Sequence, residues 1–159
     1  MITIEPPSRS SNPVVLSRTG LTRFLRRARE AVGLDGDVDV LLTSDAELRR
    51  LNRQFRKKDK STDVLSFPTP EEIAGEHAGD LAISLDTAGR QADRFGHSLD
   101  EEVRILMLHG LLHLAGMDHE TDSGEMAERE QELRKKLRLP VTLIERATRS
   151  ATKRVRSAI

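Results

Sequence analysis

The sequence predicts a single domain of layered α/β or α+β type, with about four strands and about five to six α-helices. The chain has 159 residues, which suits one domain with one core. Segments with a two-residue period alternate with segments of helical period. No residue is cysteine, so this core forms without disulfides. We expect residues 1–140 to form the domain and the basic residues 141–159 to form a weakly ordered tail.

The chain is expected to open with a short edge strand at residues 2–5, followed by a loop bounded by prolines at residues 6–13. Apolar side chains recur at helical offsets between Leu21 and Val32, which predicts the first helix. Gly33 is suited to end this helix because glycine accepts the left-handed conformation of a helix C-terminus.

A strand and a helix are predicted next. Residues 38–43 are rich in valine and leucine and have the composition of a strand. Ser44 and Glu47 have the spacing of a capping box, which predicts a second helix that continues through Phe55. Beyond it we expect two further strands and a short helix, at residues 63–67 before Pro68, at residues 79–84, and from Asp86 onward.

The most apolar helix is predicted after Ser98, which forms a second capping box with Glu101. Its apolar side chains from Val103 to Leu114 cover almost every face, so it should be buried and should hold any functional side chain stiffly. A last helix, with a charged and solvated face, is expected to open near residues 122–123 and to end at Pro140.

Three of the five histidines lie in the segment HGLLHLAGMDH, at residues 109–119. His109 and His113 are four residues apart, so on a helix their Cβ atoms lie about 5–6 Å apart on one face. If Gly116 ends the helix, the chain can turn and bring His119 to the same point. Three imidazoles leave an open position on a zinc ion, which is typical of catalytic zinc. Other divalent transition metals accept the same three ligands.

The remaining candidates are weaker. His77 lies in a polar, loop-like stretch and His97 follows a glycine just before a helix start, so both are interpreted as ordinary surface residues. A three-histidine zinc site favours hydrolysis. In zincins, the zinc proteases whose metal helix this one resembles, a glutamate base follows the first histidine, whereas here Gly110 does. Asp118 is either a proton acceptor or orienting group beside the metal, or a turn former.

Between Arg49 and Lys60 there are seven basic residues and one acidic residue, although the whole chain has 26 of each. This segment is either a solvated helix end or a phosphate-binding surface, since a guanidinium can hold phosphate oxygens with two parallel bonds. Trp and Tyr are absent and Phe occurs four times, so base stacking on aromatic platforms is not expected. No long apolar run or secretion signal is present, which favours a cytoplasmic protein with no membrane contact.

The histidine segment, together with residues 52–68 and 79–84, resembles the YbeY family of bacterial rRNA maturation factors over about residues 38–137. The resemblance implies an α+β fold, a single compact domain in which a small mixed β-sheet is flanked by helices. It also implies a zinc-dependent, single-strand-specific endoribonuclease. Its task would be 16S rRNA 3′-end maturation and ribosome quality control, with the 30S subunit and its assembly factors as partners.

The same resemblance implies roles for individual residues. His109, His113 and His119 would be the metal ligands, with His113 also counted as catalytic. Arg56 matches the arginine of the family's Arg-x-Lys-Asp motif, which is assigned to RNA cleavage. The basic tail lies outside the family pattern, and its charge alone makes it a candidate RNA-contacting extension. Two residues depart from the family pattern: Phe55 where tyrosine is frequent, and Ser61 where proline is frequent.

Two other functions fit parts of the sequence: a noncatalytic ribosome-assembly module that zinc only stabilises, and a zinc peptidase, which Gly110 disfavours. The sequence leaves open whether the RNA 2′-hydroxyl or a water attacks the phosphodiester, and it leaves the oligomeric state open.

Overall fold

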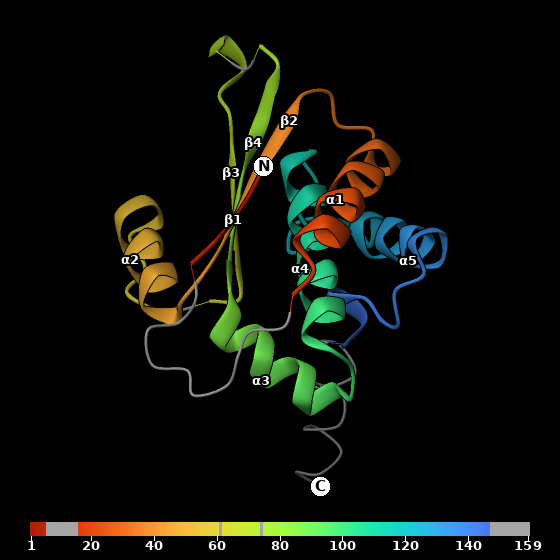
Figure 1. Ribbon diagram of the computed structural model, residues 1–159. Coiled ribbons are helices and arrows are strands. Elements are labelled where there is room, and N and C mark those ends of the chain that lie inside the picture. Colours follow the sequence, from red (N-terminus) through yellow and green to blue (C-terminus); the bar gives the residue numbers. More distant parts are fainter. Residues whose placement is uncertain (6–15, 61, 74, 147–159) are drawn as a thin grey trace, which may run out of the picture.

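The computed structural model describes residues 1–5, 16–60, 62–73 and 75–146. Four strands form one mixed sheet, and helices cover both of its faces (Figure 1). The predicted α+β class, with a four-stranded sheet, is therefore confirmed. The loop predicted at residues 6–13, and the predicted tail from residue 147 onward, lie outside the described residues.

The sheet has the order β1-β2-β4-β3, so β3 is an edge strand. The first three strands in this order run parallel, and β3 pairs with β4 in the antiparallel direction. β4 starts two residues earlier than residue 79, where the sequence placed it, because its pairing with β2 begins at His77. The bounds are β1 (Ile2–Ile4), β2 (Asp37–Thr43), β3 (Val64–Pro68) and β4 (His77–Ser84).

Four of the helices begin after a serine whose hydroxyl accepts a backbone N–H of the first turn, which satisfies a group that the helix itself leaves unpaired. These serines are Ser17, Ser44, Ser84 and Ser98. The helices are α1 (Arg18–Val32), α2 (Asp45–Arg56), α3 (Leu85–Phe95), α4 (Leu99–Leu114) and α5 (Glu125–Leu137), with a short 3-10 turn η1 (Glu71–Ile73).

The two predicted capping boxes differ in the structure. Ser98 and Glu101 each bond to the other's backbone N–H, so this box is complete. At α2 only half of the box forms, because Ser44 accepts the N–H of Glu47 while the Glu47 carboxylate pairs with Arg50. A glutamate at the third helical position can therefore pair with a side chain on the helix surface instead of capping the helix.

The last helix is shorter than predicted. It begins after Gly124, and the carboxylate of Asp122 accepts the N–H groups of Gly124 and Met126. It ends at Leu137 rather than at Pro140, because Arg138 takes the left-handed conformation, with φ of 59°. Within the described part of the chain, no helix has both the length and the apolar composition needed to cross a bilayer.

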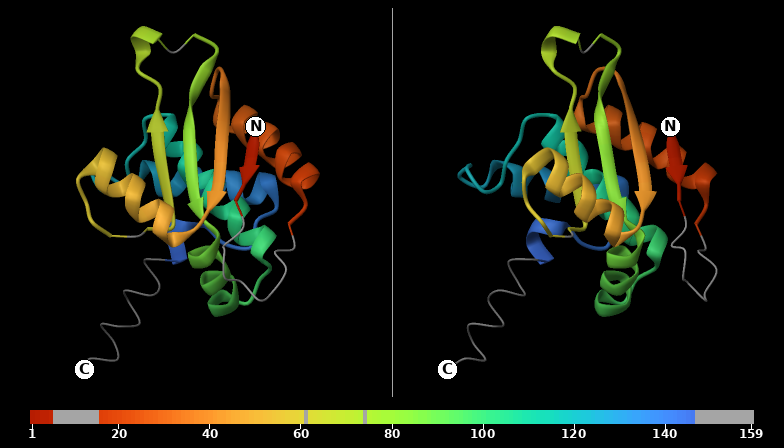
Figure 2. Two further views of the ribbon diagram at one scale, coloured as in Figure 1. Left: turned by 60° about the vertical axis from the view of Figure 1, so that its left-hand side comes forward. Right: turned by 90° about the vertical axis from the view of Figure 1, so that its left-hand side faces the viewer.

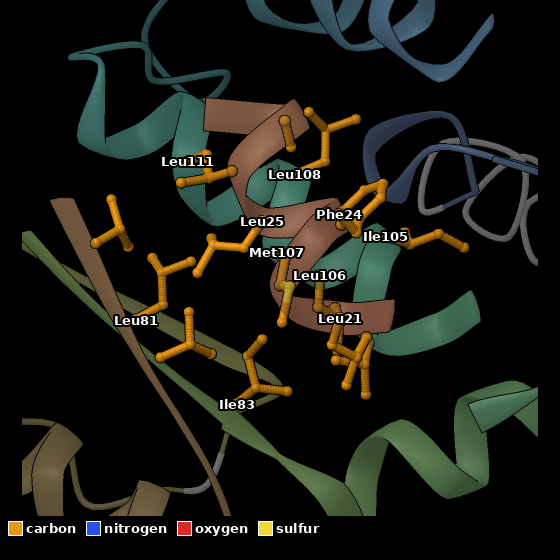
Figure 3. Packing of buried hydrophobic residues seen from close by; sticks show 14 of the residues in the cluster. Leu21, Phe24, Leu25, Leu81, Ile83, Ile105, Leu106, Met107, Leu108 and Leu111 are labelled. Carbon is orange, nitrogen blue, oxygen red and sulfur yellow. The ribbon is translucent and has the colours of Figure 1, made fainter. Parts of the chain in front are cut away.

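The main core lies between the sheet and the layer formed by α1 and α4, with α2 alone on the opposite face of the sheet (Figures 1 and 2). Figure 3 shows Leu81 and Ile83 of β4 facing side chains of both helices. As predicted, α4 is buried almost all round, including every residue from Ile105 to Leu112. This helix is therefore held from all sides.

Two glycines allow α4 and the strands to approach closely. A Cβ on Gly79 of β4 would lie 2.7 Å from both Leu114 Cδ2 and the Phe67 carbonyl oxygen. A Cβ on Gly110 would lie 2.8 Å from Leu81 Cδ2, and the Ser66 hydroxyl donates a 3.1 Å hydrogen bond to the Gly110 carbonyl. The C-terminal half of α4 therefore lies directly on β3 and β4.

The carboxylate of Asp45 ties the start of α2 to α3. Asp45 accepts hydrogen bonds from Ser84 Oγ at 2.5 Å, Thr87 Oγ1 at 2.6 Å and Arg90 Nη2 at 2.7 Å. Burial raises the pKa of Asp45, but these three bonds and the charge of Arg90 outweigh burial and lower it to about 2. The carboxylate is ionised at neutral pH, and it fixes the helix whose far end carries Arg56.

The chain after α5 remains packed as far as it is described. Leu139, Thr142 and Arg146 are buried, and residues 143–146 form a single helical turn. The first six residues of the predicted weakly ordered tail are thus part of the folded structure.

We expect replacement of Gly79 by alanine to destabilise the fold by about 1–3 kcal/mol, because the Phe67 carbonyl that the new methyl group meets belongs to the sheet backbone. The matched control is Gly89→Ala in α3, where a Cβ would meet nothing within 4 Å, so this variant should be neutral or up to about 1 kcal/mol more stable. Urea unfolding midpoints would measure both changes. Equal midpoints would contradict the close contact.

Candidate metal centre and groove

The C-terminal half of α4 presents His109 and His113 on one face, with their Nε2 atoms 3.1 Å apart. The helix ends at Leu114 with Ala115 as its C-cap, and Gly116 turns the chain with φ of 91°. The turn brings the ring of His119 within 5.3 Å of the His109 ring and 5.8 Å of the His113 ring, measured between centroids. One nitrogen of each histidine lies within 4.8 Å of the others. The structure therefore brings the three predicted histidines together.

The ring of His109 is oriented by a buried carboxylate. Its Nδ1 lies 2.9 Å from Oε2 of Glu130, a side chain that is 1% exposed. Because an ionised carboxylate only accepts, Nδ1 of His109 donates the proton and Nε2 keeps its lone pair toward the other two rings. This histidine and carboxylate arrangement is common behind metal ligands.

The other two rings also suit a cation. Burial lowers the pKa of His113, and the neighbouring His109 and His119 lower it further, so this ring is neutral at pH 7. Nδ1 of His119 is buried and has no hydrogen-bond partner among the described residues. A bound ion would satisfy a buried polar atom that has no hydrogen-bond partner. Three imidazoles with ring nitrogens this close together fit a divalent transition metal.

Asp118 forms the turn between His113 and His119. Its carboxylate accepts the N–H of Glu120 at 3.0 Å, and its carbonyl accepts the N–H groups of Thr121 and Asp122. The turn-forming interpretation of this aspartate is the one that its contacts support, although the residue also lines the groove described next.

The histidines lie in a groove of about 650 Å³. One wall consists of the turn after α4, and the opposite wall consists of β3 and the end of α2 with the loop that follows it. Leu143 and Ile144, from the chain after α5, line it as well. The metal helix thus forms part of an open groove rather than a closed cage.

The basic segment divides into two sets. Arg49 pairs with Asp59 at 2.8 Å and Arg50 pairs with Glu47, so these arginines form the solvated helix surface that was one interpretation of the segment. Lys58 and Lys60, on either side of Asp59, line the groove.

The loop after α2 is held by a buried amide. The side chain of Asn52, in a residue that is 2% exposed, donates a 3.0 Å hydrogen bond to the Lys60 carbonyl. Lys57 allows the chain to leave the helix because it takes the left-handed conformation, with φ of 55°. These contacts keep the loop cations beside the groove.

Arg56 lines the same groove as the three histidines. Its Nη2 donates a 2.7 Å hydrogen bond to the carbonyl of Ser66 on the edge strand β3, which fixes the direction of the side chain. Arg56 precedes the three histidines by 53 to 63 positions, and yet all four residues line one groove. Sequence spacing alone does not predict this placement.

The interpretation of His97 as a surface residue is wrong. Its side chain is 6% exposed, and Nε2 lies 2.7 Å from Oε1 of the fully buried Glu102. His97 stands just before the N-cap of α4, a position whose side chain packs against the fourth helical residue, and here that residue is Glu102. His77 is partly exposed, as expected, with Asp80 at 3.3 Å, but it belongs to β4 and not to a loop.

Sequence reasoning missed Glu130, although a signal was present. The apolar stripe of α5 consists of Met126, Leu133 and Leu137, and position 130 falls on that stripe. A carboxylate in such a position must have a buried partner, because an isolated buried charge is costly. The pattern could have indicated a buried polar contact, but not that His109 makes it.

In comparisons with known proteins, residues 16–138 match the family model described as "Endoribonuclease YbeY". The chain is 60% identical to the endoribonuclease YbeY of Koribacter versatilis, over 87% of this chain and 89% of that protein. It is 55% identical to the namesake in Solibacter usitatus, over 84% of this chain and 88% of that protein. The solution structure of TM1509 from Thermotoga maritima is similar, with a TM-score of 0.54 and 29% identity over 86% of this chain and 89% of that one.

We expect His113→Ala to lower the affinity for Zn²⁺ and Co²⁺ by at least about tenfold, because it removes one of three nitrogens from the site. The control is Gln54→Ala, which removes an exposed side chain outside the groove and should leave both affinities unchanged. Calorimetric titration of the metal-free protein would measure the two constants. Equal losses in both variants would contradict the assignment.

Proposed function

Since this chain belongs to the endoribonuclease YbeY family and is an endoribonuclease, we propose that it is a zinc-dependent enzyme that cleaves single-stranded RNA. One observation carries the proposal: three imidazoles and an arginine line the same groove. The metal ligands in this proposal are His109, His113 and His119, and Arg56 is the residue that stabilises charge on the phosphate.

A zinc ion in this site would supply Lewis-acid chemistry, polarising a phosphoryl oxygen and lowering the pKa of a water molecule. His109 holds its Nε2 lone pair toward the site because Glu130 binds its other nitrogen. Arg56 donates one N–H to the Ser66 carbonyl, which is the single hydrogen bond that its guanidinium makes among the described residues. Its other N–H groups can donate to the nonbridging oxygens of the phosphate. These oxygens gather charge as the phosphodiester breaks, and a fixed guanidinium stabilises that charge.

The groove favours a flexible strand over a duplex. His109 is only 5% exposed, so a phosphodiester has to enter the groove in order to reach the histidines. A single strand can bend its backbone into the groove, whereas a duplex holds its phosphates on a rigid surface. Lys58 and Lys60 can contact phosphates of the same strand, and no phenylalanine lines the groove, so binding should show little base preference.

The biological setting is proposed from the family resemblance. We place the cleavage in 16S rRNA 3′-end maturation and ribosome quality control, in the cytoplasm, with the 30S subunit and its assembly factors as partners. A groove that holds phosphates without reading bases is consistent with this setting, because the ribosomal particle would then select the cleavage position.

The structure disfavours a peptidase. The position after His109, where zincins carry a glutamate base, is Gly110, and a Cβ there would lie 2.8 Å from Leu81 Cδ2, so a larger residue would require the Leu81 side chain to shift. The edge strand beside the groove offers its Ser66 carbonyl to Arg56 and not to a peptide substrate. Both features leave a phosphodiester as the substrate that the groove suits.

We expect Arg56→Ala to lower the rate of RNA cleavage by about 100-fold to 1,000-fold, the usual cost of removing one donor that stabilises a charged transition state. Metal affinity should not change, because Arg56 contacts no histidine. Arg53→Ala is the control, since Arg53 lies on the same helix but outside the groove lining. Single-turnover cleavage of a labelled single-stranded RNA would measure the rates. A metal-loaded Arg56→Ala variant that cleaves as fast as the wild type would remove the proposed role.

We expect the double variant Lys58→Ala/Lys60→Ala to bind single-stranded RNA more weakly and with a shallower salt dependence. For two lost phosphate contacts the slope of log K against log salt should shrink by about 1.4. The control Lys135→Ala/Lys136→Ala removes the same charge from exposed positions on α5 and should keep the wild-type slope. Fluorescence anisotropy at several salt concentrations would measure it, and equal slopes in all three proteins would place the RNA elsewhere.

A further inference from the structure

The chain after α5, residues 139–146, returns across the molecule to the groove, and we call it the C-terminal strap. It lies beyond residues 16–138, the part of the chain that matches the family model. In Figure 2 its dark-blue helical turn lies beside the beginning of β3. Leu143 and Ile144 of the strap line the groove that holds the histidines.

The end of the strap is anchored by a buried ion pair. Nη1 and Nη2 of Arg146 donate to the two oxygens of the Glu102 carboxylate, at 2.6 and 2.9 Å. The side chains are 5% and 0% exposed. Arg146 also donates to Gln91 at 3.3 Å and lies 4.3 Å from the centre of the Phe95 ring. A bidentate pair of this kind fixes direction as well as distance, so the strap is held against α3 and α4.

Two residues earlier, the backbone of the strap contacts the support of the metal centre. The N–H of Ile144 donates to Oε1 of Glu130 at 3.1 Å, while Oε2 of the same carboxylate accepts from His109 Nδ1 at 2.9 Å. Each oxygen of Glu130 thus has one partner, the strap on one side and the His109 ring on the other. Glu130 is 1% exposed while the strap is in place, so solvent does not supply a partner to this carboxylate in the folded protein.

We propose that Arg146 is a positioning residue for the metal centre. By pinning the strap on α4, it keeps the Ile144 N–H on Glu130 and thereby fixes the orientation of the His109 ring. The inference rests on the proposed function, in which His109 is a metal ligand. Residues behind a metal ligand commonly change metal affinity 10-fold to 100-fold, because they set the ring angle and the tautomer.

The test compares metal binding by full-length Arg146→Gln and Arg146→Lys variants with the wild type. Arg94→Gln is the matched control, since Arg94 also lies over Phe95, at 5.2 Å, but on the exposed surface of α3. Dissociation constants for Zn²⁺ and Co²⁺, and the visible absorption of the Co²⁺ form, are measured well below the lowest unfolding temperature. We expect Arg146→Gln to bind both ions about 10-fold to 100-fold more weakly and with an altered Co²⁺ spectrum. Arg146→Lys should lose less, because it keeps the charge but not the two-pronged contact.

A double variant tests the route through Glu130. If Arg146 acts through this carboxylate, Glu130→Gln/Arg146→Gln should bind metal no more weakly than Glu130→Gln alone, since the second change acts on a contact that is already altered. Strictly additive losses would overturn the route. Should Arg146→Gln fail to fold, Arg146→Lys, alone and combined with Glu130→Gln, carries the same comparison.

The opposite result is equally clear. If both Arg146 variants have lowered unfolding temperatures but wild-type metal affinities and Co²⁺ spectra, Arg146 only stabilises the fold and the proposal is wrong. A wild-type protein that binds metal but does not cleave RNA would overturn the proposed function and leave this test in force. A wild-type protein that binds neither ion would overturn both.

Discussion

The close packing of α4 on the β3–β4 hairpin is the constraint on which the groove depends. Gly110 lets the helix backbone approach Leu81 and Ser66, and Gly79 lets the strand approach the end of the same helix. A Cβ at Gly79 would meet the Phe67 carbonyl of the sheet backbone, and a Cβ at Gly110 would require the side chain of Leu81 to shift. His109 and His113 lie in the groove beside β3, and so do Arg56 and the basic loop. The geometry of the site is thus a result of backbone packing.

The second organising feature is a pair of buried carboxylates. Glu102 and Glu130 are 0% and 1% exposed at their side chains, and each binds a histidine and a donor from the C-terminal strap. Glu102 forms a buried ion pair with Arg146, and removing one member of such a pair typically costs about 3–5 kcal/mol, because its partner is left charged and unsolvated. The two carboxylates therefore join the end of the described chain to α4, and their cost is offset only while every member stays in place.

The sequence was informative where a function depends on local spacing. The cluster of three histidine rings could be predicted from two local features, the four-residue interval between His109 and His113 and the turn at Gly116. The Ser98 capping box and the apolar content of α4 gave its position and its burial. In each case the residues concerned interact within a few turns of one helix, so the pattern along the chain is also the pattern in space.

The sequence was not sufficient where contacts join distant segments. His97 and Glu102 are five residues apart, but the arginine that completes their cluster is Arg146, 44 residues beyond Glu102. The residues around His97 do not show that a segment much later in the sequence will bury this histidine. The same holds for Glu130 and His109, which are 21 residues apart. Such pairs are set by how helices pack, and periodicity describes each helix separately.

The hydrogen bond from Arg56 to Ser66 has a consequence beyond chemistry. In an antiparallel edge strand every second residue directs its backbone groups away from the sheet, and Ser66 is one of these residues, since Asp63 and Thr69 bond to the β4 side. An open edge of this kind can recruit another chain as an added strand. Arg56 covers the carbonyl, and Pro68, two residues further on, has no N–H to offer. The same guanidinium that faces the groove thereby shields the fold from self-association through its sheet.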